Sequence, residues 1–267
     1  MLRTADKGLV VGERLNNVFG GRGERLHPST KPPQIKGPNI PPVSGYVAHY
    51  DPSDLSTVTR GAGGLVTAMA DKTGSFNSTS VTGAVFCFPL ADRFHGRTAL
   101  FFPNTIAHVN TGMSMSDITC SAFCVGNIVT GTSILPTLIG PSADGGLTMR
   151  VNSSAGDLKP YAASADVADL GDNDAFPVTV GTPFVMGILL QANQAIIYNN
   201  LNSETDANAV TTFTAARTLA IGAAPSVAGG TSRMYGWVGE LVMYDTTLSA
   251  GNAEAVIGYL MSKWGIT

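Results

Sequence analysis

The sequence predicts an all-β protein, an antiparallel β-sandwich or barrel with a short C-terminal helix and an extended N-terminal arm. Three observations predict this architecture. Short apolar runs bounded by turn residues recur from residue 44 onward, with no helical pattern between them. The last segment changes to helical periodicity. The first 43 residues carry Pro and Gly at a density that blocks helices and central strands alike.

Residues 1–43 form the predicted arm, and their charge differs from that of the predicted sandwich domain, residues 44–267. The arm has a net charge of +4, whereas the rest of the chain has −7. A basic arm on an acidic body favours docking onto another subunit, and a solvated flexible tail is the alternative. Nucleic acid is a poor fit, because the arm lacks a dense Lys/Arg run with interleaved aromatics. The basic residues expected to dock are Arg3, Lys7, Arg14, Arg22, Arg25, Lys31 and Lys36.

The low content of charged residues limits the classes of protein to which the chain can belong. Only 13% of the residues are charged, which suits tightly packed assemblies as well as secreted β proteins. Cys120 and Cys124 would lie about 13 Å apart on one face of a strand, too far to pair with each other. We expect these two and Cys87 to be small buried hydrophobic residues in a reducing compartment.

Residues 1–6 lack the apolar core of a signal peptide, so we expect synthesis and assembly in the host cytoplasm, without a membrane.

The strands are predicted from apolar runs and turn signals. Segments 183–190 and 194–198 should form a hairpin across Gln191-Ala192-Asn193. Along 118–125, Cys120, Ala122 and Cys124 alternate onto one face. The complete set of predicted strands is 45–50, 65–69, 84–88, 98–102, 118–125, 133–139, 147–151, 183–190, 194–198, 219–221 and 237–244.

The closing helix has both end signals. Ser249 is a good N-cap, Lys263 suits the negative end of the helix dipole, and Gly265 is a plausible stop. One face should pack on the sandwich, and it consists of Ala253, Val256, Ile257, Leu260 and Trp264.

Several short motifs occur in a recognisable order. They are Tyr50-Asp51-Pro52-Ser53-Asp54, Asp71-Lys72-Thr73-Gly74, Tyr198-Asn199-Asn200, Leu219-Ala220-Ile221-Gly222, Gly236–Asp245, Leu248-Ser249 and Tyr259–Gly265. Over residues 46–267 this set resembles the concanavalin A-like lectin/glucanase (laminin-G-like) superfamily. The ending Lys263-Trp264-Gly265 resembles domains of bacterial surface and phage structural proteins. The resemblance implies a concanavalin A-like (jelly-roll) antiparallel β-sandwich and a structural, partnered role for Glu240. It does not fix a function, because this fold carries many.

Catalytic chemistry finds little support. Retaining glycanases of this fold use the strand motif E-x-D-x-x-E, which supplies the two carboxylates that flank the sugar bond. The nearest match begins Glu204-Thr205-Asp206, but its last position is Ala209, and the segment reads as a polar loop. No nucleophile motif accompanies the four histidines, although partners distant in the chain leave a triad open. We therefore expect a protein that is not an enzyme.

Two loops offer weaker binding candidates. Tyr161, near Asp157, could contact a glycan, and an ordinary half-buried tyrosine is the alternative. A cluster of acids could hold Ca²⁺, but its spacing fits no strict calcium loop, and surface turns use the same residues. The acids of this cluster are Asp166, Asp169, Asp172 and Asp174. No other metal or cofactor is expected.

These features predict a structural or assembly protein of a virion, such as a phage capsid decoration, head-fibre or tail-associated subunit. It would dock on other virion subunits through residues 1–43, in a homo-oligomer or multi-copy assembly, and display a lectin-like domain. The alternative is a carbohydrate-binding lectin module for attachment to a cell-surface glycan. A glycoside hydrolase is a third, disfavoured hypothesis.

Overall fold

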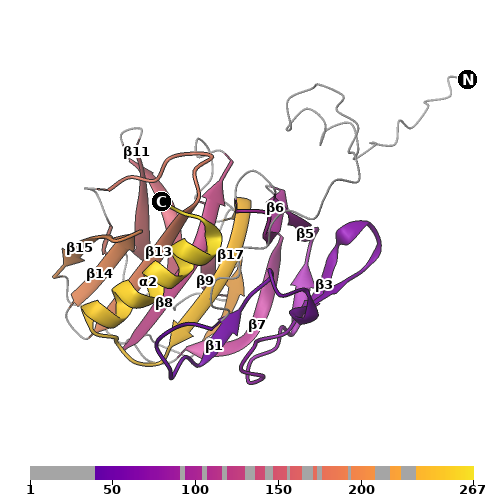
Figure 1. Ribbon diagram of the computed structural model, residues 1–267, viewed down its shortest axis with the longest axis horizontal. Coiled ribbons are helices and arrows are strands. Elements are labelled where there is room, and N and C mark those ends of the chain that lie inside the picture. Colours follow the sequence, from indigo (N-terminus) through magenta and orange to yellow (C-terminus); the bar gives the residue numbers. More distant parts are fainter. Residues whose placement is uncertain are drawn as a thin grey trace, which may run out of the picture. The chain divides into compact units, whose positions relative to one another are not determined.

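The alternating apolar residues of the strands are buried between two antiparallel sheets packed face to face, as a computed structural model of the chain shows (Figure 1). Residues 1–39 lie outside the described part, so the arm, its docking residues and its boundary stay predictions. The described residues are 40–90, 94–103, 107–115, 119–129, 136–141, 147–154, 157–163, 171–172, 176–191, 194–207, 217–223 and 233–267.

The first sheet has eight strands, and β17 is its long central member. Strand β17 pairs with β8 on one side and with both β6 and β1 on the other. The predicted hairpin is confirmed, because β13 and β14 pair antiparallel up to Gln191 and Gln194. The order is β15 (Asn202–Asp206), β14 (Gln194–Asn199), β13 (Phe184–Gln191), β8 (Cys120–Ile128), β17 (Tyr235–Tyr244), β6 (Thr98–Pro103) and β5 (Phe86–Pro89), with β1 (Ala48–Tyr50) on β17.

The second sheet has seven strands and forms the other layer of the sandwich. Its order is β12 (Gly171–Asp172), β11 (Asp157–Ala163), β10 (Thr148–Ser154), β9 (Thr137–Pro141), β16 (Arg217–Ile221), β7 (His108–Met115) and β4 (Ser80–Thr82). A separate two-stranded ribbon consists of β2 (Val58–Arg60) and β3 (Val66–Met69), and two short 3-10 turns lie at Leu55–Thr57 and Ala62–Gly64.

The space between the sheets is filled by apolar side chains, which we call the inter-sheet core. The predicted alternation of β8 is confirmed, since Cys120, Ala122 and Cys124 all belong to this core. Cys87 is buried there as well, and all three cysteines are free thiols, as expected. Burial raises the pKa of the Cys87 thiol to about 11, so it stays protonated at neutral pH.

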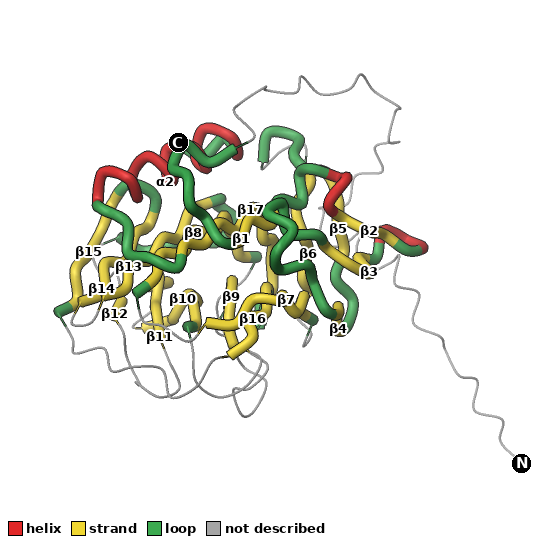
Figure 2. Tube along the Cα trace, turned by 90° about the horizontal axis from the view of Figure 1, so that it is seen from below, coloured by secondary structure: helices red, strands yellow, loops and turns green. Residues whose placement is uncertain are grey.

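The helix α2 (Ala250–Trp264) lies on the side of the eight-stranded sheet that faces away from the second sheet (Figure 2). Ser249 caps it as predicted, accepting a hydrogen bond from the backbone N–H of Asn252. Gly265 ends it in the left-handed region, with φ 65°. A side chain at Gly265 would also collide with the His95 ring. The stop is therefore specified by both conformation and space.

Between α2 and its sheet lies a second apolar cluster, the helix-side core. All five residues of the predicted helix stripe are buried in it: Ala253, Val256, Ile257, Leu260 and Trp264. The Trp264 ring meets Phe94 edge-on and approaches β17 closely at Gly239, where a Cβ would lie 3.1 Å from the indole. In the described part of the chain, no helix is long and apolar enough to cross a membrane.

The strand predictions were incomplete. Six strands were missed, namely β2, β4, β7, β11, β12 and β15. The interpretation of the segment with Glu204 and Asp206 as a polar loop was wrong, because both residues lie in β15 at the edge of the sheet. An edge strand can be polar on both faces, so its sequence lacks the apolar alternation on which the prediction relied.

The helix packing can be tested with one substitution at two sites. Ala253→Asp places a carboxylate in the helix-side core and should lower the free energy of unfolding by at least about 3 kcal/mol. Ala255→Asp makes the same change on the exposed face of α2 and should cost less than about 1 kcal/mol. Urea unfolding measures both. Equal losses would mean that α2 does not pack on the sheet as described.

Candidate functional site

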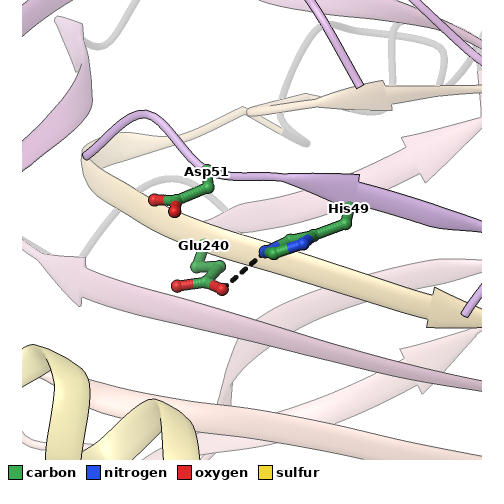
Figure 3. A group of neighbouring side chains, drawn as sticks. All are labelled: His49, Asp51 and Glu240. Atoms are coloured by element: carbon green, nitrogen blue, oxygen red, sulfur yellow. Dashed lines mark hydrogen bonds and ion pairs between the residues drawn. The ribbon is translucent and has the colours of Figure 1, made fainter. Parts of the chain in front are cut away.

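Three side chains that could ligate a metal converge beneath α2. His49 lies in β1, Asp51 directly follows β1, and Glu240 lies in β17. One potential ligand atom from each lies within 4.8 Å of the others. Figure 3 shows the His49 ring pointing toward the Glu240 carboxylate, with Asp51 alongside. The antiparallel pairing of β1 with β17 brings these residues together, although they are far apart in the sequence.

A fourth residue, Lys263 from α2, already occupies the cation position. Its Nζ lies 2.7 Å from Asp51 Oδ2 and 2.5 Å from Glu240 Oε2. The Lys263 and Glu240 side chains are 0% exposed, and that of Asp51 is 2% exposed. An ammonium group at these distances neutralises both carboxylates and leaves no room for a metal ion between them. The residues therefore fit an ion-pair cluster and do not fit a metal site.

Glu240 is hydrogen-bonded on both oxygens. Its Oε1 lies 2.6 Å from His49 Nε2 and accepts a hydrogen bond from the Tyr259 hydroxyl at 2.7 Å. Its Oε2 accepts one from the Trp264 indole N–H at 3.0 Å. Since an ionised carboxylate can only accept, His49 must carry a proton on Nε2. The pKa of Tyr259 is strongly raised by burial and by the Glu240 charge, so its hydroxyl remains a donor.

Asp51 is held ionised from two directions. Its Oδ1 accepts hydrogen bonds from the Ser53 backbone N–H at 3.1 Å and the Ser53 hydroxyl at 2.6 Å. Lys72 lies 3.4 Å from Oδ2 at the more exposed side. Burial opposes ionisation, but the charge and hydrogen bond of Lys263 outweigh it, and the pKa of Asp51 falls to about 2.

A third buried carboxylate, Asp71, fixes the turn that follows β3. Its Oδ1 accepts a hydrogen bond from the backbone N–H of His49 at 2.7 Å. Its Oδ2 accepts from the backbone N–H groups of Ser75 and Phe76 at 3.2 and 3.1 Å. The Asp71-Lys72-Thr73-Gly74 motif thus supports the strand that carries His49. Neither carboxylate cluster is open to solvent, so neither can reach an external substrate.

A more accessible candidate surface is the outer face of the seven-stranded sheet. The row Val81, Val109 and Ile221 points into the inter-sheet core, so the neighbouring row with Ser80 and Asn110 points outward. Asn110 Nδ2 donates to Ser80 Oγ at 2.8 Å. In the described residues, no helix covers this face.

Hydroxyl groups continue across this surface. Thr82 and Ser114 are exposed, and Ser114 Oγ lies 3.3 Å from Thr218 Oγ1 on the adjacent strand. We call the set Ser80, Thr82, Asn110, Ser114 and Thr218 the polar face. Its groups are uncharged and both donate and accept hydrogen bonds.

Only some of the site residues predicted from the sequence lie among the residues that the structure describes. Asp157 and Tyr161 lie in β11 of the seven-stranded sheet, where Tyr161 pairs in register with Arg150 and Asp172. Asp172 lies in β12, whereas Asp166, Asp169 and Asp174 are outside the described residues. Glycan contact and Ca²⁺ binding therefore stay predictions. Sequence reasoning found Glu240 but missed its partners Asp51, His49 and Lys263.

The ion-pair cluster can be tested by removing its cation. Lys263→Met keeps the packed stem but leaves Glu240 without a counter-charge and Asp51 with Lys72 alone, so the free energy of unfolding should fall by about 3–5 kcal/mol. Lys72→Met, at the half-exposed edge, should cost less than about 1 kcal/mol. Chemical denaturation measures both. A Lys263→Met loss as small as that of Lys72→Met would contradict the cluster's role.

The sequence matches no protein-family model and no curated protein. Solved structures are similar. Domain 4 of AbnA, a GH43 extracellular arabinanase from Geobacillus stearothermophilus solved with arabinotriose, has a TM-score of 0.60 and 13% identity. The match covers 80% of this chain and 98% of that domain.

Trypanosoma rangeli sialidase is also similar. A mutant displaying trans-sialidase activity has a TM-score of 0.56 and 12% identity, covering 85% of this chain and 35% of that one. The complex with sialic acid has a TM-score of 0.53 and 11% identity, covering 83% and 34%. This chain thus spans about a third of the sialidase length. At these identities the comparisons establish the fold, a concanavalin A-like β-sandwich.

Proposed function

We propose that this chain is a non-catalytic carbohydrate-binding domain. The observation that carries the proposal is the match to domain 4 of AbnA. The match extends over nearly all of that domain, whose structure was solved with arabinotriose. The sialidases add weaker support, because their similar region is only about a third of an enzyme that was solved in complex with sialic acid. The domain of AbnA was solved with arabinotriose and the sialidase with sialic acid, so the two neighbours differ in the sugar that they bind.

The polar face is the surface proposed to receive the ligand. Sugars present many neutral hydroxyl groups, which are best matched by side chains that donate and accept hydrogen bonds without a full charge. The polar face offers such groups on three strands, from Ser80 and Asn110 to Thr218. Strand β11, with Asp157 and Tyr161, belongs to the same sheet and supplies the proposed glycan contacts.

A non-enzymatic role is proposed from the placement of the described carboxylates. Asp51 and Glu240 are closed off by Lys263, and Asp71 is held by backbone N–H groups. The glycanase-like motif at Glu204 and Asp206 lacks its third acid, since position 209 is alanine.

A second proposal is assembly into a virion, with residues 1–43 docking on other subunits. The charge contrast between the +4 arm and the −7 remainder favours it. The two proposals are compatible, because an arm could dock while the sandwich displays a sugar site outward.

Glycan binding can be measured on an array and then by calorimetry with arabino-oligosaccharides and sialosides. We expect binding that weakens at least tenfold, about 1.4 kcal/mol, in Asn110→Ala and Tyr161→Ala. Glu254→Ala, on the exposed face of α2, should leave it unchanged. The same titration with a chelator tests the Ca²⁺ prediction.

No binding to any array glycan would contradict the carbohydrate proposal. Binding that Glu254→Ala weakens as much as Asn110→Ala would move the site away from the polar face.

A further inference from the structure

The ion-pair cluster also places an amine, a carboxyl group and a second carboxylate in a reactive arrangement. Lys263 Nζ lies 2.7 Å from Asp51 Oδ2, and the carboxyl carbon of Asp51 is one bond beyond that oxygen. Glu240 Oε2 lies 2.5 Å from the same Nζ, within reach for proton transfer. Glu240 is held by β17, Lys263 by α2 and Asp51 by the buried position that directly follows β1, so the three groups are already close together before the reaction.

We propose that Lys263 and Asp51 become joined by an intramolecular isopeptide bond, with Glu240 transferring the protons. This modification is independent of the carbohydrate-binding proposal. It would covalently link the segment after the first strand to the last turn of the C-terminal helix.

The reaction balances without an added reagent. The Lys263 ammonium passes one proton to Asp51 Oδ2 through their hydrogen bond, which gives a neutral amine and a neutral acid. Nζ then attacks the Asp51 carboxyl carbon and forms a tetrahedral centre. Glu240 accepts a proton from Nζ and returns it to Oδ2, which leaves as water. The ammonium and carboxylate charges disappear together, an amide remains, and Glu240 is again ionised.

Ser53 stabilises the charge that develops on the other oxygen. Asp51 Oδ1 already accepts hydrogen bonds from the Ser53 N–H and hydroxyl, at 3.1 and 2.6 Å. When Nζ attacks, Oδ1 becomes the oxyanion, and these two donors are in place to stabilise it. The leaving oxygen is Oδ2, the one that faces Lys263. The two carboxyl oxygens thus have different surroundings that match their different roles.

The remaining neighbours position Glu240 and exclude water. Tyr259 and Trp264 donate to its two oxygens, and His49 holds Oε1 from the β1 side. Burial favours the amide because it removes two of the three desolvated charges, and the Glu240 carboxylate that remains keeps its hydrogen bonds from Tyr259 and Trp264. The low pKa of Asp51 opposes the first proton transfer and makes the reaction slow. A single turnover per chain is sufficient, so a slow reaction can still reach completion.

Intact mass spectrometry of the full chain under denaturing conditions tests the proposal directly. We expect the purified protein to be lighter than its sequence by the mass of one water molecule. Digestion should yield a branched peptide that joins the Asp51 and Lys263 segments. A wild-type mass equal to that of the sequence, on freshly folded and on aged protein, would overturn the proposal without any variant.

Variants assign the roles. Lys263→Arg keeps the charge but cannot form the bond, and it should retain its full sequence mass. Glu240→Gln should form the bond at least tenfold more slowly, whereas the edge variant Lys72→Arg should form it completely. Circular dichroism checks that each variant folds. Equal rates in Glu240→Gln and wild type would overturn the role of Glu240. Water loss in Lys263→Arg would show that another residue is the amine.

Discussion

The structure depends on the contact of the Lys263 side chain with Asp51 and Glu240. These residues come from the last helix, the segment after the first strand and the central strand β17. Each of these groups is buried, so replacing any one of them leaves a buried polar or charged group without its partner. The cluster therefore couples helix docking to the correct pairing of β1 with β17. Breaking any one contact leaves an unpaired charge in the helix-side core.

This constraint explains why short motifs far apart in the chain occur together. Asp51 comes from the motif after β1, Glu240 from β17, and Lys263 with Trp264 from the helix end. Trp264 both donates to Glu240 and fills the space over Gly239. Three of the motifs that carry the resemblance, those with Asp51, Glu240 and Lys263, thus contribute to one buried polar network. These motifs specify the fold, and they therefore give no indication of a ligand.

Local patterns made much of the fold predictable from the sequence. The helix limits followed from Ser249 and Gly265, and the β13–β14 hairpin followed from its turn. Strand β7 was missed because His108, Asn110 and Ser114 give it a polar outward row that masks its apolar one. The ion-pair cluster was not predictable, because Lys263 and Asp51 are 212 positions apart and only the fold brings them together. Lys263 was read as a helix-dipole residue, a local role that gives no sign of its burial.

The outer faces of the two sheets differ in what covers them. The outer side of the eight-stranded sheet is occupied by α2 and the network that holds it. The outer side of the seven-stranded sheet carries neutral polar groups that the described fold does not use for packing. Because the stabilising cluster lies on one layer, residues on the outer side of the other layer can vary without loss of the fold.

The most direct test of the central claim is a double-mutant cycle between Lys263 and Glu240, measured by chemical denaturation of wild type, Lys263→Met, Glu240→Gln and the double variant. We predict strong coupling, with the double variant more stable than the sum of the two losses implies by at least about 2 kcal/mol. Additive losses would mean that the two residues act independently, and that the buried cluster does not hold the sandwich and its helix together.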